Sequence, residues 1–272
     1  MTVSRALSHR LTASALAIVL AAGLALAEPK TPFEPRVGQP GKDVIWVPTA
    51  QALVDRMLDM ANVGPGDVHF DLGSGDGRTV ISAARRGATA IGVEFNPDMV
   101  NLSRENARKA GVSDRATFIE DDLFAADISK ATSISLFLLP SINIKLRPKI
   151  LDLHPGTRVV SNSFDMGDWR PDRTDEAVNN CSSYCRAHFW IVPAKVDGVW
   201  KLPNGELRIQ QTYQWFQGTL RTGASSMTIS DGKMVGDVIT FVAGDTRYTG
   251  RVSGSAIEGL ALTSSAWSVT RN

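Results

Sequence analysis

Three glycines alternate with other residues directly after a short hydrophobic run that ends in an acid. The segment reads Asp71-Leu72-Gly73-Ser74-Gly75-Asp76-Gly77-Arg78. Glycine at such positions permits positive φ angles and lets a ligand approach the backbone, because no Cβ stands in the way. Since β-prone residues precede the segment and a helical pattern follows it, we expect a strand, a glycine turn and a helix. This order is typical of a loop that holds a nucleoside-bearing cofactor.

The spacing of the glycines separates two classes of cofactor. Loops that bind dinucleotides follow G-x-G-x-x-G and place a pyrophosphate at a helix N-terminus. Counted from Gly73, the third glycine of that pattern falls on Arg78, whereas the spacing here is G-x-G-x-G. The carboxylate of Asp71 also suits a cationic ligand and would repel a pyrophosphate. A dinucleotide oxidoreductase is therefore the weaker alternative.

Acidic residues also follow two later hydrophobic runs. Glu94 follows Ala90-Ile91-Gly92-Val93, about 20 residues beyond the glycine turn, where an acid at a strand end can accept hydrogen bonds from both ribose hydroxyls. Asp121 and Asp122 follow the run Ala116-Thr117-Phe118-Ile119. An isolated acid after a strand is more often a solvated turn or a helix N-cap. The ordered series of acids and glycines favours a cofactor site instead.

Together these motifs resemble the class I, or seven-β-strand, methyltransferases, which use S-adenosylmethionine. The resemblance covers roughly Val47 to Asp172. It implies that Glu94 holds the ribose and that Asp122 accepts from the adenine amino group, with Asp121 as the alternative. A Val-Pro-Thr segment lies over the cofactor in that family, so Thr49 is a further candidate, although Thr49 could instead be a helix N-cap. The expected cofactor-binding residues are Thr49, Asp71, Gly73, Ser74, Gly75, Gly77, Glu94, Asp121 and Asp122.

Later segments are similar to one subgroup, the protein-lysine methyltransferases that modify the c subunit of the mitochondrial ATP synthase and the adenine nucleotide translocase. These segments are residues 137–140, 158–161 and 166–169. The resemblance implies an enzyme that transfers a methyl group in line to a protein amine, with alignment and desolvation as the protein's main contributions. Many amine methyltransferases carry Asn or Asp and two prolines after the fourth strand. This chain has Leu138-Leu139-Pro140-Ser141 there, which disfavours methylation of adenine or of a glutamine amide. We assign no general base, and the acceptor-site candidates are Leu138, Leu139, Pro140 and Trp169.

Alternating strand and helix patterns must position these residues. We expect strands at 67–70, 90–93, 116–119, 134–139 and 158–161, and helices at 50–61, 78–86, 96–110 and 142–153. This alternation predicts an α/β fold with a parallel, doubly wound, Rossmann-like sheet that binds its ligand at the carboxyl ends of the strands. After about residue 192, short β-prone runs separated by turns such as Asn204-Gly205 and Asp231-Gly232 predict a small antiparallel all-β domain. Its aromatic residues could line a cleft, although aromatic residues more often form the core of such a domain.

The N-terminus is typical of a secretory signal peptide. Basic residues precede an apolar run from Leu11 to Ala27, which ends in the small-residue pattern Ala25-Leu26-Ala27. We therefore expect a periplasmic or secreted protein, with an uncleaved membrane anchor as the alternative. The expected organisation is a signal peptide at 1–27, an extended arm at 28–43, a methyltransferase domain at 44–193 and a β-rich domain at 194–272. An alternative function is an exported, non-catalytic protein that engages an envelope partner through the β-rich domain.

Charge and cysteine content narrow the partners and the redox chemistry. The formal net charge is +1, so the chain lacks the basic character typical of nucleic-acid binding, and we expect no nucleic acid as a partner. The resemblance implies a protein substrate. In an exported protein, Cys181 and Cys185 are expected to form a local disulfide. A metal site that also used His188 would need a fourth ligand, which the local sequence does not supply, so we expect no metal.

Overall fold

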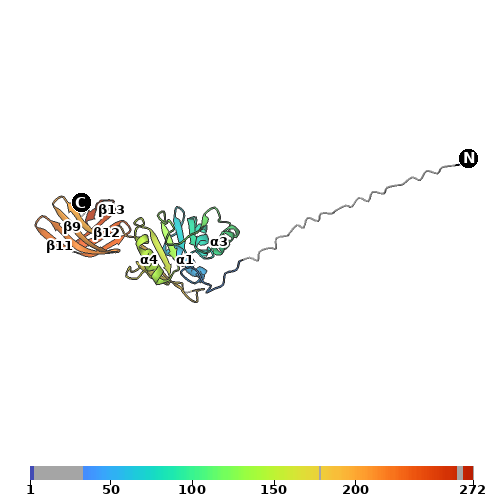
Figure 1. Cartoon of the computed structure of the whole chain (residues 1–272). Coiled ribbons are helices and arrows are strands. Elements are labelled where there is room, and N and C mark those ends of the chain that lie inside the picture. Colours follow the sequence, from blue (N-terminus) through green and yellow to red (C-terminus); the bar gives the residue numbers. More distant parts are fainter. Residues whose placement is uncertain (3–32, 178, 262–265, 272) are drawn as a thin grey trace. The chain divides into compact units, whose positions relative to one another are not determined.

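The structure is a computed structural model, and residues 1–2, 33–177, 179–261 and 266–271 are described below. The predicted signal peptide lies outside the described residues except for its first two, and the start of the predicted arm lies outside them as well. The chain divides into two compact units, Met1–Pro32 and Phe33–Asn272. The second unit contains a seven-stranded sheet with its helices and a closed β-barrel (Figure 1).

The sheet has the strand order β3-β2-β1-β4-β5-β7-β6. Five strands are parallel: Val68–Leu72 (β1), Thr89–Glu94 (β2), Ala116–Glu120 (β3), Ser133–Leu136 (β4) and Arg158–Asn162 (β5). The strand order reverses at β1, which has β2 on one side and β4 on the other. In open α/β sheets a ligand binds at such a reversal, beyond the carboxyl ends of the strands. The predicted Rossmann-like fold is confirmed.

Two strands at one edge differ from the predicted parallel sheet. Arg186–Ile191 (β7) pairs antiparallel with β5, and Arg173–Glu176 (β6) pairs antiparallel with β7, so the sheet is mixed. Strand β6 was not predicted, because its four residues are Arg-Thr-Asp-Glu and carry no hydrophobic run. As an edge strand with mostly exposed side chains, β6 needs none.

Helices cover both faces of the sheet. They are Gln51–Met60 (α1), Arg78–Arg85 (α2), Pro97–Lys109 (α3) and Pro140–Leu151 (α4). Buried residues of α1, α2 and α3 share one hydrophobic cluster with Val160, whereas those of α4 share a second cluster with Val159. Adjacent residues of β5 thus face opposite layers, as the alternation of side chains along a strand requires. The fourth strand ends three residues earlier than expected, at Leu136, and Phe137–Leu139 leave the sheet before Pro140 starts α4.

The C-terminal part of the described chain is a closed, antiparallel eight-stranded barrel, which confirms the predicted all-β domain. Its strands are Gly198–Leu202 (β8), Gly205–Thr212 (β9), Trp215–Thr222 (β10), Ser225–Val235 (β11), Val238–Ala243 (β12), Thr246–Ser253 (β13), Ala256–Ala261 (β14) and Ala266–Arg271 (β15). The predicted turn at Asp231-Gly232 is wrong. These residues form a bulge inside β11, where Asp231 has a φ of 50° and the register shifts against both neighbouring strands. Phe241 packs against Phe216, Tyr248 and Trp267, so these rings belong to the barrel core.

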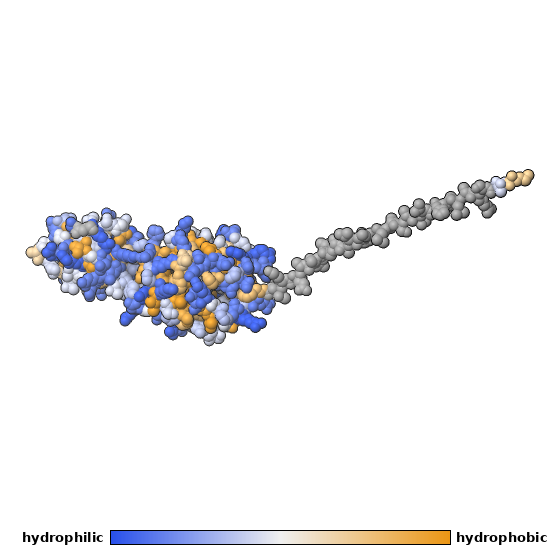
Figure 2. Space-filling model, in the orientation of Figure 1, coloured by the Kyte–Doolittle hydropathy of each residue, from blue (hydrophilic) through white to orange (hydrophobic). Residues whose placement is uncertain are grey.

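Hydrophobic residues reach the surface of the second unit in separate groups among hydrophilic ones (Figure 2). Within the ranges given above, none of the helices combines the length and the apolar character needed to cross a membrane.

Candidate functional site

The glycine loop between β1 and α2 has a conformation that only glycine adopts easily. Gly73, Gly75 and Gly77 have φ angles of 80°, 53° and 81°. A Cβ at Gly77 would lie 2.8 Å from the ring of Phe118, and a Cβ at Gly75 would lie 2.7 Å from Nε1 of Trp46. The loop therefore requires glycine both for its backbone angles and for space.

Side chains of α3 hold this loop from behind. Ser103 Oγ donates to the carbonyl of Gly75 over 2.7 Å, and Asn106 Nδ2 donates to the carbonyl of Asp76 over 3.0 Å. Ser103 is fully buried. Because these bonds occupy carbonyls of the loop, the loop conformation is fixed before any ligand binds.

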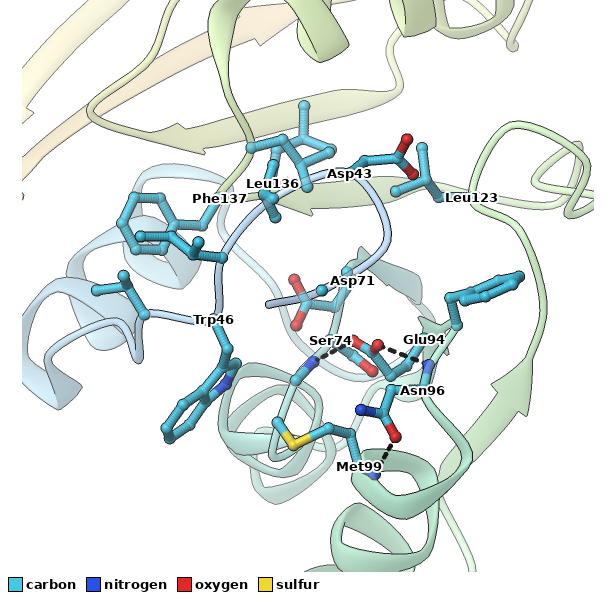
Figure 3. Close-up of a pocket in the computed structure, with 18 of the residues that line it drawn as sticks. Asp43, Trp46, Asp71, Ser74, Glu94, Asn96, Met99, Leu123, Leu136 and Phe137 are labelled. Carbon is cyan, nitrogen blue, oxygen red and sulfur yellow. Dashed lines mark hydrogen bonds between the residues drawn. The ribbon is translucent and has the colours of Figure 1, made fainter. Parts of the chain in front are cut away.

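A cavity of about 570 Å³ lies beside the glycine loop at the carboxyl ends of the parallel strands (Figure 3). This volume lies in the range of pockets that hold small ligands and cofactors. Its charged lining consists of six acidic and two basic side chains, namely Asp43, Asp71, Asp76, Glu94, Asp121, Asp122, Lys42 and Arg78. The excess of acid gives the cavity a negative potential, which favours a cationic ligand.

Asp71, in β1, is the buried acid of the cavity. Ser135 Oγ donates to its Oδ1 over 2.6 Å. Burial raises the pKa of Asp71 to about 7, and the negative charges of Asp76 and Glu94 act in the same direction. A cation bound in the cavity would favour the carboxylate and lower this pKa again.

A buried polar chain continues from Asp71 away from the cavity. His69 lies with Nδ1 2.8 Å from Ser133 Oγ and Nε2 3.0 Å from Ser135 Oγ. Burial lowers the pKa of His69 to about 3, so the ring is neutral and carries one N–H. Because the hydroxyl of Ser135 donates to Asp71, Nε2 of His69 donates to Ser135 and Nδ1 accepts from Ser133. The imidazole therefore orients the hydroxyl that holds Asp71.

This polar chain was not predicted, although the sequence carries a signal for it. His69 pairs with Ser133 and Asp71 pairs with Ser135 across β1 and β4, and both pairs are two residues apart along their strands. Residues at i and i+2 share a face of a strand. Polar residues at this spacing on two neighbouring hydrophobic strands were thus the available signal.

Glu94, at the end of β2, is held by backbone N–H groups at both carboxylate oxygens. The N–H of Gly75 donates to Oε2 over 3.0 Å, and the N–H of Asn96 donates to Oε1 over 2.9 Å (Figure 3). Each oxygen keeps a further lone pair as an acceptor. Glu94 therefore lies at the cavity as a fixed double acceptor, which suits two adjacent hydroxyls.

Both acids considered at the end of β3 line the cavity. Asp122 accepts from Lys42 Nζ over 2.5 Å and from the N–H of Phe124 over 2.9 Å, and these two bonds lower its pKa. Asp121 Oδ1 accepts from the N–H of Asp122 over 2.7 Å. Asp122 is therefore ionised and forms an ion pair with Lys42, whereas the side chain of Asp121 accepts only from a backbone N–H.

Residues 36–49, which we call the strap, include a further wall of the cavity, which residues 39–49 form. The N–H of Gly38 donates to the carbonyl of Trp46 over 2.8 Å, and the N–H of Trp46 donates to the carbonyl of Gln39 over 2.9 Å, which closes the strap into a loop. Lys42 lies 4.5 Å from the centre of the Phe95 ring and bonds to Asp122. Within the expected arm, residues 36–43 thus form part of a hydrogen-bonded loop and are not extended.

Thr49 lines the cavity at the end of the strap and does not cap a helix. The N-cap residue of α1 is Ala50. Thr49 Oγ1 accepts from Asn162 Nδ2 over 3.2 Å, and its carbonyl accepts from a guanidinium nitrogen of Arg78 over 2.8 Å. Arg78 also forms an ion pair with Asp76 at 2.6 Å, so these two residues connect the glycine loop to the strap.

The acceptor-site candidates are divided by the structure. Leu138 and Leu139 line the cavity next to Phe137, whereas Pro140 and Trp169 do not. Trp169 is fully buried, and its Nε1 donates to Gln214 Oε1 over 3.0 Å. Trp169 was expected to line the acceptor channel, but its indole is buried away from the cavity, where it packs against residues of the barrel.

Two aromatic residues that were not predicted as site residues line the same end of the cavity. They are Phe164, which follows β5, and Tyr184, which precedes β7. Cys181 and Cys185 form the expected disulfide on either side of Tyr184. In the ranges that the structure covers, no group of three or more His, Cys, Asp or Glu side chains could hold a metal ion.

The residues present fit S-adenosylmethionine. The cofactor carries a sulfonium and an ammonium, and the cavity offers the carboxyl group of Asp71 within a negative lining. Glu94 offers two fixed acceptors for ribose hydroxyls, and Asp121 and Asp122 lie at the neighbouring strand end. At Gly75 a Cβ would lie 2.7 Å from Nε1 of Trp46, so only glycine leaves room for the indole that lines the cavity there.

Comparisons with known proteins agree with this assignment. Residues 71–173 match the protein family described as the ANTKMT methyltransferase domain. A protein-lysine N-methyltransferase of Saccharolobus islandicus (strain REY15A) is 43% identical over 131 residues, which cover 47% of this chain and 81% of that protein. The human lysine N-methyltransferase of the ATP synthase c subunit is 33% identical over 146 residues, which cover 53% of this chain and 62% of that protein. The chain thus spans a little under two thirds of the human relative.

A solved structure is similar to the sheet domain. It is described as an RNA methyltransferase from Salinibacter ruber in complex with S-adenosyl-L-homocysteine, and it has a TM-score of 0.52 and 51% identity. The match covers 55% of this chain and 96% of that one. The descriptions of these relatives therefore agree on methyl transfer and name different acceptors.

Proposed function

We propose that this chain, which belongs to the ANTKMT family of S-adenosylmethionine-dependent methyltransferases, methylates the side-chain nitrogen of lysine in a protein. The observation that carries this proposal is the lining of the cavity. Six acidic side chains face two basic ones, and Lys42 and Arg78 are each paired with an acid. Such a lining attracts an ammonium group and repels the phosphates of RNA.

The entrance of the cavity supports a protein as the acceptor. Ile45, Phe95, Leu139 and Tyr184 line the cavity although each exposes a large part of its side chain to solvent. An exposed hydrophobic group around a cavity fits a protein segment better than a nucleic-acid backbone. The lysine would then enter past an apolar entrance toward an acidic interior.

The chemistry requires little from the protein beyond placement. The bound cofactor would supply a methyl group on a sulfonium. A neutral amine attacks the methyl carbon in line, so that the C–N bond forms as the C–S bond breaks and the thioether leaves. The chain's residues hold the two reactants in line and exclude water. Leu138 and Leu139 provide apolar surface near the amine, and this surface favours its neutral form. The proton leaves the amine to solvent, and we assign no side chain as a general base.

The test is transfer of a labelled methyl group from S-adenosylmethionine to fractionated protein and RNA of the host. We expect label that protease removes and ribonuclease does not, and methyl-lysine after acid hydrolysis. Asp71→Ala, checked for folding, should transfer no label. Label in RNA, or in protein residues other than lysine, would overturn the acceptor assignment without affecting the assignment of the cofactor.

We also propose that the chain works outside the cytoplasm. The motivation is the predicted signal peptide, which lies outside the described residues, and the Cys181–Cys185 disulfide, a bond that persists in oxidising compartments. Fractionation of the host with N-terminal sequencing of the mature protein tests this proposal. A cytoplasmic protein that retains its first residues would contradict it.

A further inference from the structure

We propose that Phe137, Phe164 and Tyr184 form an aromatic subsite that receives the acceptor ammonium, and that the Cys181–Cys185 disulfide positions Tyr184 in it. This inference rests on the proposed function, since it names the residues that contact the amine. It adds a role for a five-residue disulfide loop that the cofactor site does not use.

The three rings form one cluster at the cavity. The ring centres of Phe137 and Tyr184 are 5.3 Å apart, those of Phe164 and Tyr184 are 6.0 Å apart, and those of Phe137 and Phe164 are 6.1 Å apart. Phe137 and Phe164 are nearly parallel, with an interplanar angle of 19°, whereas Tyr184 is inclined to Phe137 by 62°. All three residues line the cavity. Ring centres at these distances place the three rings in contact with one another, so they form a continuous aromatic surface on the cavity. An alkylammonium group binds to the exposed face of such a ring.

The order of the strands places this cluster opposite the acids that suit the nucleoside. Glu94 ends β2, and Asp121 follows β3, on one side of β1. Phe137 follows β4, and Phe164 follows β5, on the other side. With the glycine loop after β1 between them, the cavity has an acidic half and an aromatic half. A cofactor that spans the acids and the glycine loop leaves the aromatic half to the acceptor.

Phe164 is held from below by buried polar groups. Its carbonyl accepts from Ser161 Oγ over 2.7 Å and from Asn143 Nδ2 over 3.2 Å. Asn143 and Ser161 are both fully buried. The backbone that carries the Phe164 ring is therefore held by α4 and β5.

Tyr184 is held by the disulfide in place of a helix or strand. The residue lies between β6 and β7, has a φ of 54°, and leaves 46% of its side chain exposed. A positive φ is unfavourable for a bulky residue, so the surrounding chain must impose it. The disulfide closes residues 181–185 into a small ring, and the N–H of Ala177 donates to the carbonyl of Cys185 over 2.8 Å, which anchors that ring to the end of β6.

The test compares four variants in steady-state kinetics with a lysine-containing acceptor. Tyr184→Ala removes the ring, and a cation–π contact of about 1.4 kcal/mol corresponds to a tenfold rise in KM for the acceptor. Tyr184→Phe keeps the ring face and should stay within about twofold of wild type. The double variant Cys181→Ser/Cys185→Ser should raise KM by roughly threefold to tenfold, and reduction of the wild type should do the same. Ser182→Ala, in the same loop but outside the cavity lining, is the matched control.

Two further measurements separate this inference from its alternatives. Calorimetry with S-adenosyl-L-homocysteine should give the same Kd for all variants, and thermal unfolding should show that each is folded. Loss of cofactor affinity in Tyr184→Ala, or an unchanged KM, would overturn the role of Tyr184. Wild-type kinetics in the double cysteine variant would overturn the role of the disulfide.

A binding assay tests the subsite even where the proposed acceptor is wrong. Nα-acetyl-Nε-methyl-lysine is titrated into the complex of the chain with S-adenosyl-L-homocysteine, with acetyl-norleucine as the control that lacks the side-chain charge. Binding of the methylammonium probe that Tyr184→Ala weakens supports the subsite, even if protein lysine is not methylated. Equal binding of both probes, or no binding of either, would contradict it.

Discussion

The carboxyl group of Asp71 meets two opposing demands. Burial in β1 raises its pKa to about 7, which favours the neutral acid, whereas a cationic ligand requires the carboxylate. Ser135 donates to it over 2.6 Å and favours the charged form. The Asp71 carboxylate therefore destabilises the fold when the cavity is empty. A bound cation offsets this cost.

Asp71→Asn should separate stability from binding. Because the pKa of Asp71 is raised from 3.8 to about 7, its contribution to stability is full below pH 3.8 and is lost as the pH rises to about 7. Relative to wild type, the variant without ligand should thus gain stability from pH 4 to pH 8, on the order of a few kcal/mol. Urea unfolding at both pH values measures this difference. Affinity for S-adenosylmethionine should rise with pH near 7 in wild type and stay low in the variant, and an affinity of the variant equal to that of wild type would contradict the assignment of Asp71.

His69 predicts the opposite pH dependence. Its pKa falls from 6.5 to about 3 on burial, so its contribution to stability is present above pH 6.5 and is lost as the pH falls toward 3. His69→Gln keeps polar groups near Ser133 and Ser135 but cannot titrate. The free energy of unfolding of this variant should change less between pH 7 and pH 4.5 than that of wild type. Parallel pH profiles would show that His69 does not carry the acid sensitivity.

At the scale of elements, the strap is the part of the cavity that depends on distant sequence. Lys42 contacts Asp122, which follows β3, and Trp46 lies beside Gly75 of the glycine loop. Lys42 is exposed and Trp46 is half-buried, as surface residues commonly are. The strap therefore contributes to the site by lining the cavity and not by forming a hydrophobic core of its own.

Trp46→Ala should lower the affinity for S-adenosylmethionine about tenfold, since it removes a large ring from the wall over Gly75. Lys42→Ala should lower it less than about threefold, because its ion pair with Asp122 is partly exposed and is screened by salt. Val37→Ala is the control, because Val37 belongs to the strap, is 70% exposed and does not line the cavity. Calorimetry at low and high salt measures all three. A larger loss for Lys42→Ala than for Trp46→Ala would contradict this order.

The predictable and unpredictable parts of the site differ in the range of the contacts that define them. The glycine loop could be predicted because its residues are contiguous, and Glu94 could be predicted because strand ends of parallel strands meet at one edge. Tyr184 could not, since only the antiparallel return of β7 brings the disulfide loop to the end of β4. Phe164 follows β5 at the same edge of the sheet, so the rule that applies to Glu94 would have predicted its place. The prediction that Trp169 lines the acceptor channel was wrong because its hydrogen-bond partner, Gln214, lies far along the chain, in the turn between β9 and β10 of the barrel.

At the scale of the whole molecule, the barrel is more than an appended core. Its turn between β9 and β10 contacts the segment after β5: Tyr213 donates to Asp168 Oδ2 over 3.0 Å, and Gln214 accepts from Trp169 and donates from Nε2 to the carbonyl of Arg170 over 2.8 Å. Gln214 and Trp169 are both buried. A buried amide with both ends bonded specifies one arrangement of its neighbours. These contacts join the turn between β9 and β10 of the barrel to the loop that follows β5.

Gln214→Ala should therefore destabilise the chain without changing the cofactor site. The variant leaves the indole N–H of Trp169 and the carbonyl of Arg170 without their partner, which costs about 1–3 kcal/mol for each buried group left unpaired. Gln217→Ala, at an exposed position of β10, should change stability by less than about 0.5 kcal/mol. Urea unfolding measures both, and calorimetry should give a Kd for S-adenosylmethionine within about twofold of wild type, because neither glutamine lines the cavity. Equal stability of the two variants would show that the buried amide is not a required contact, and a tenfold weaker Kd for Gln214→Ala would show that the barrel acts on the cofactor site.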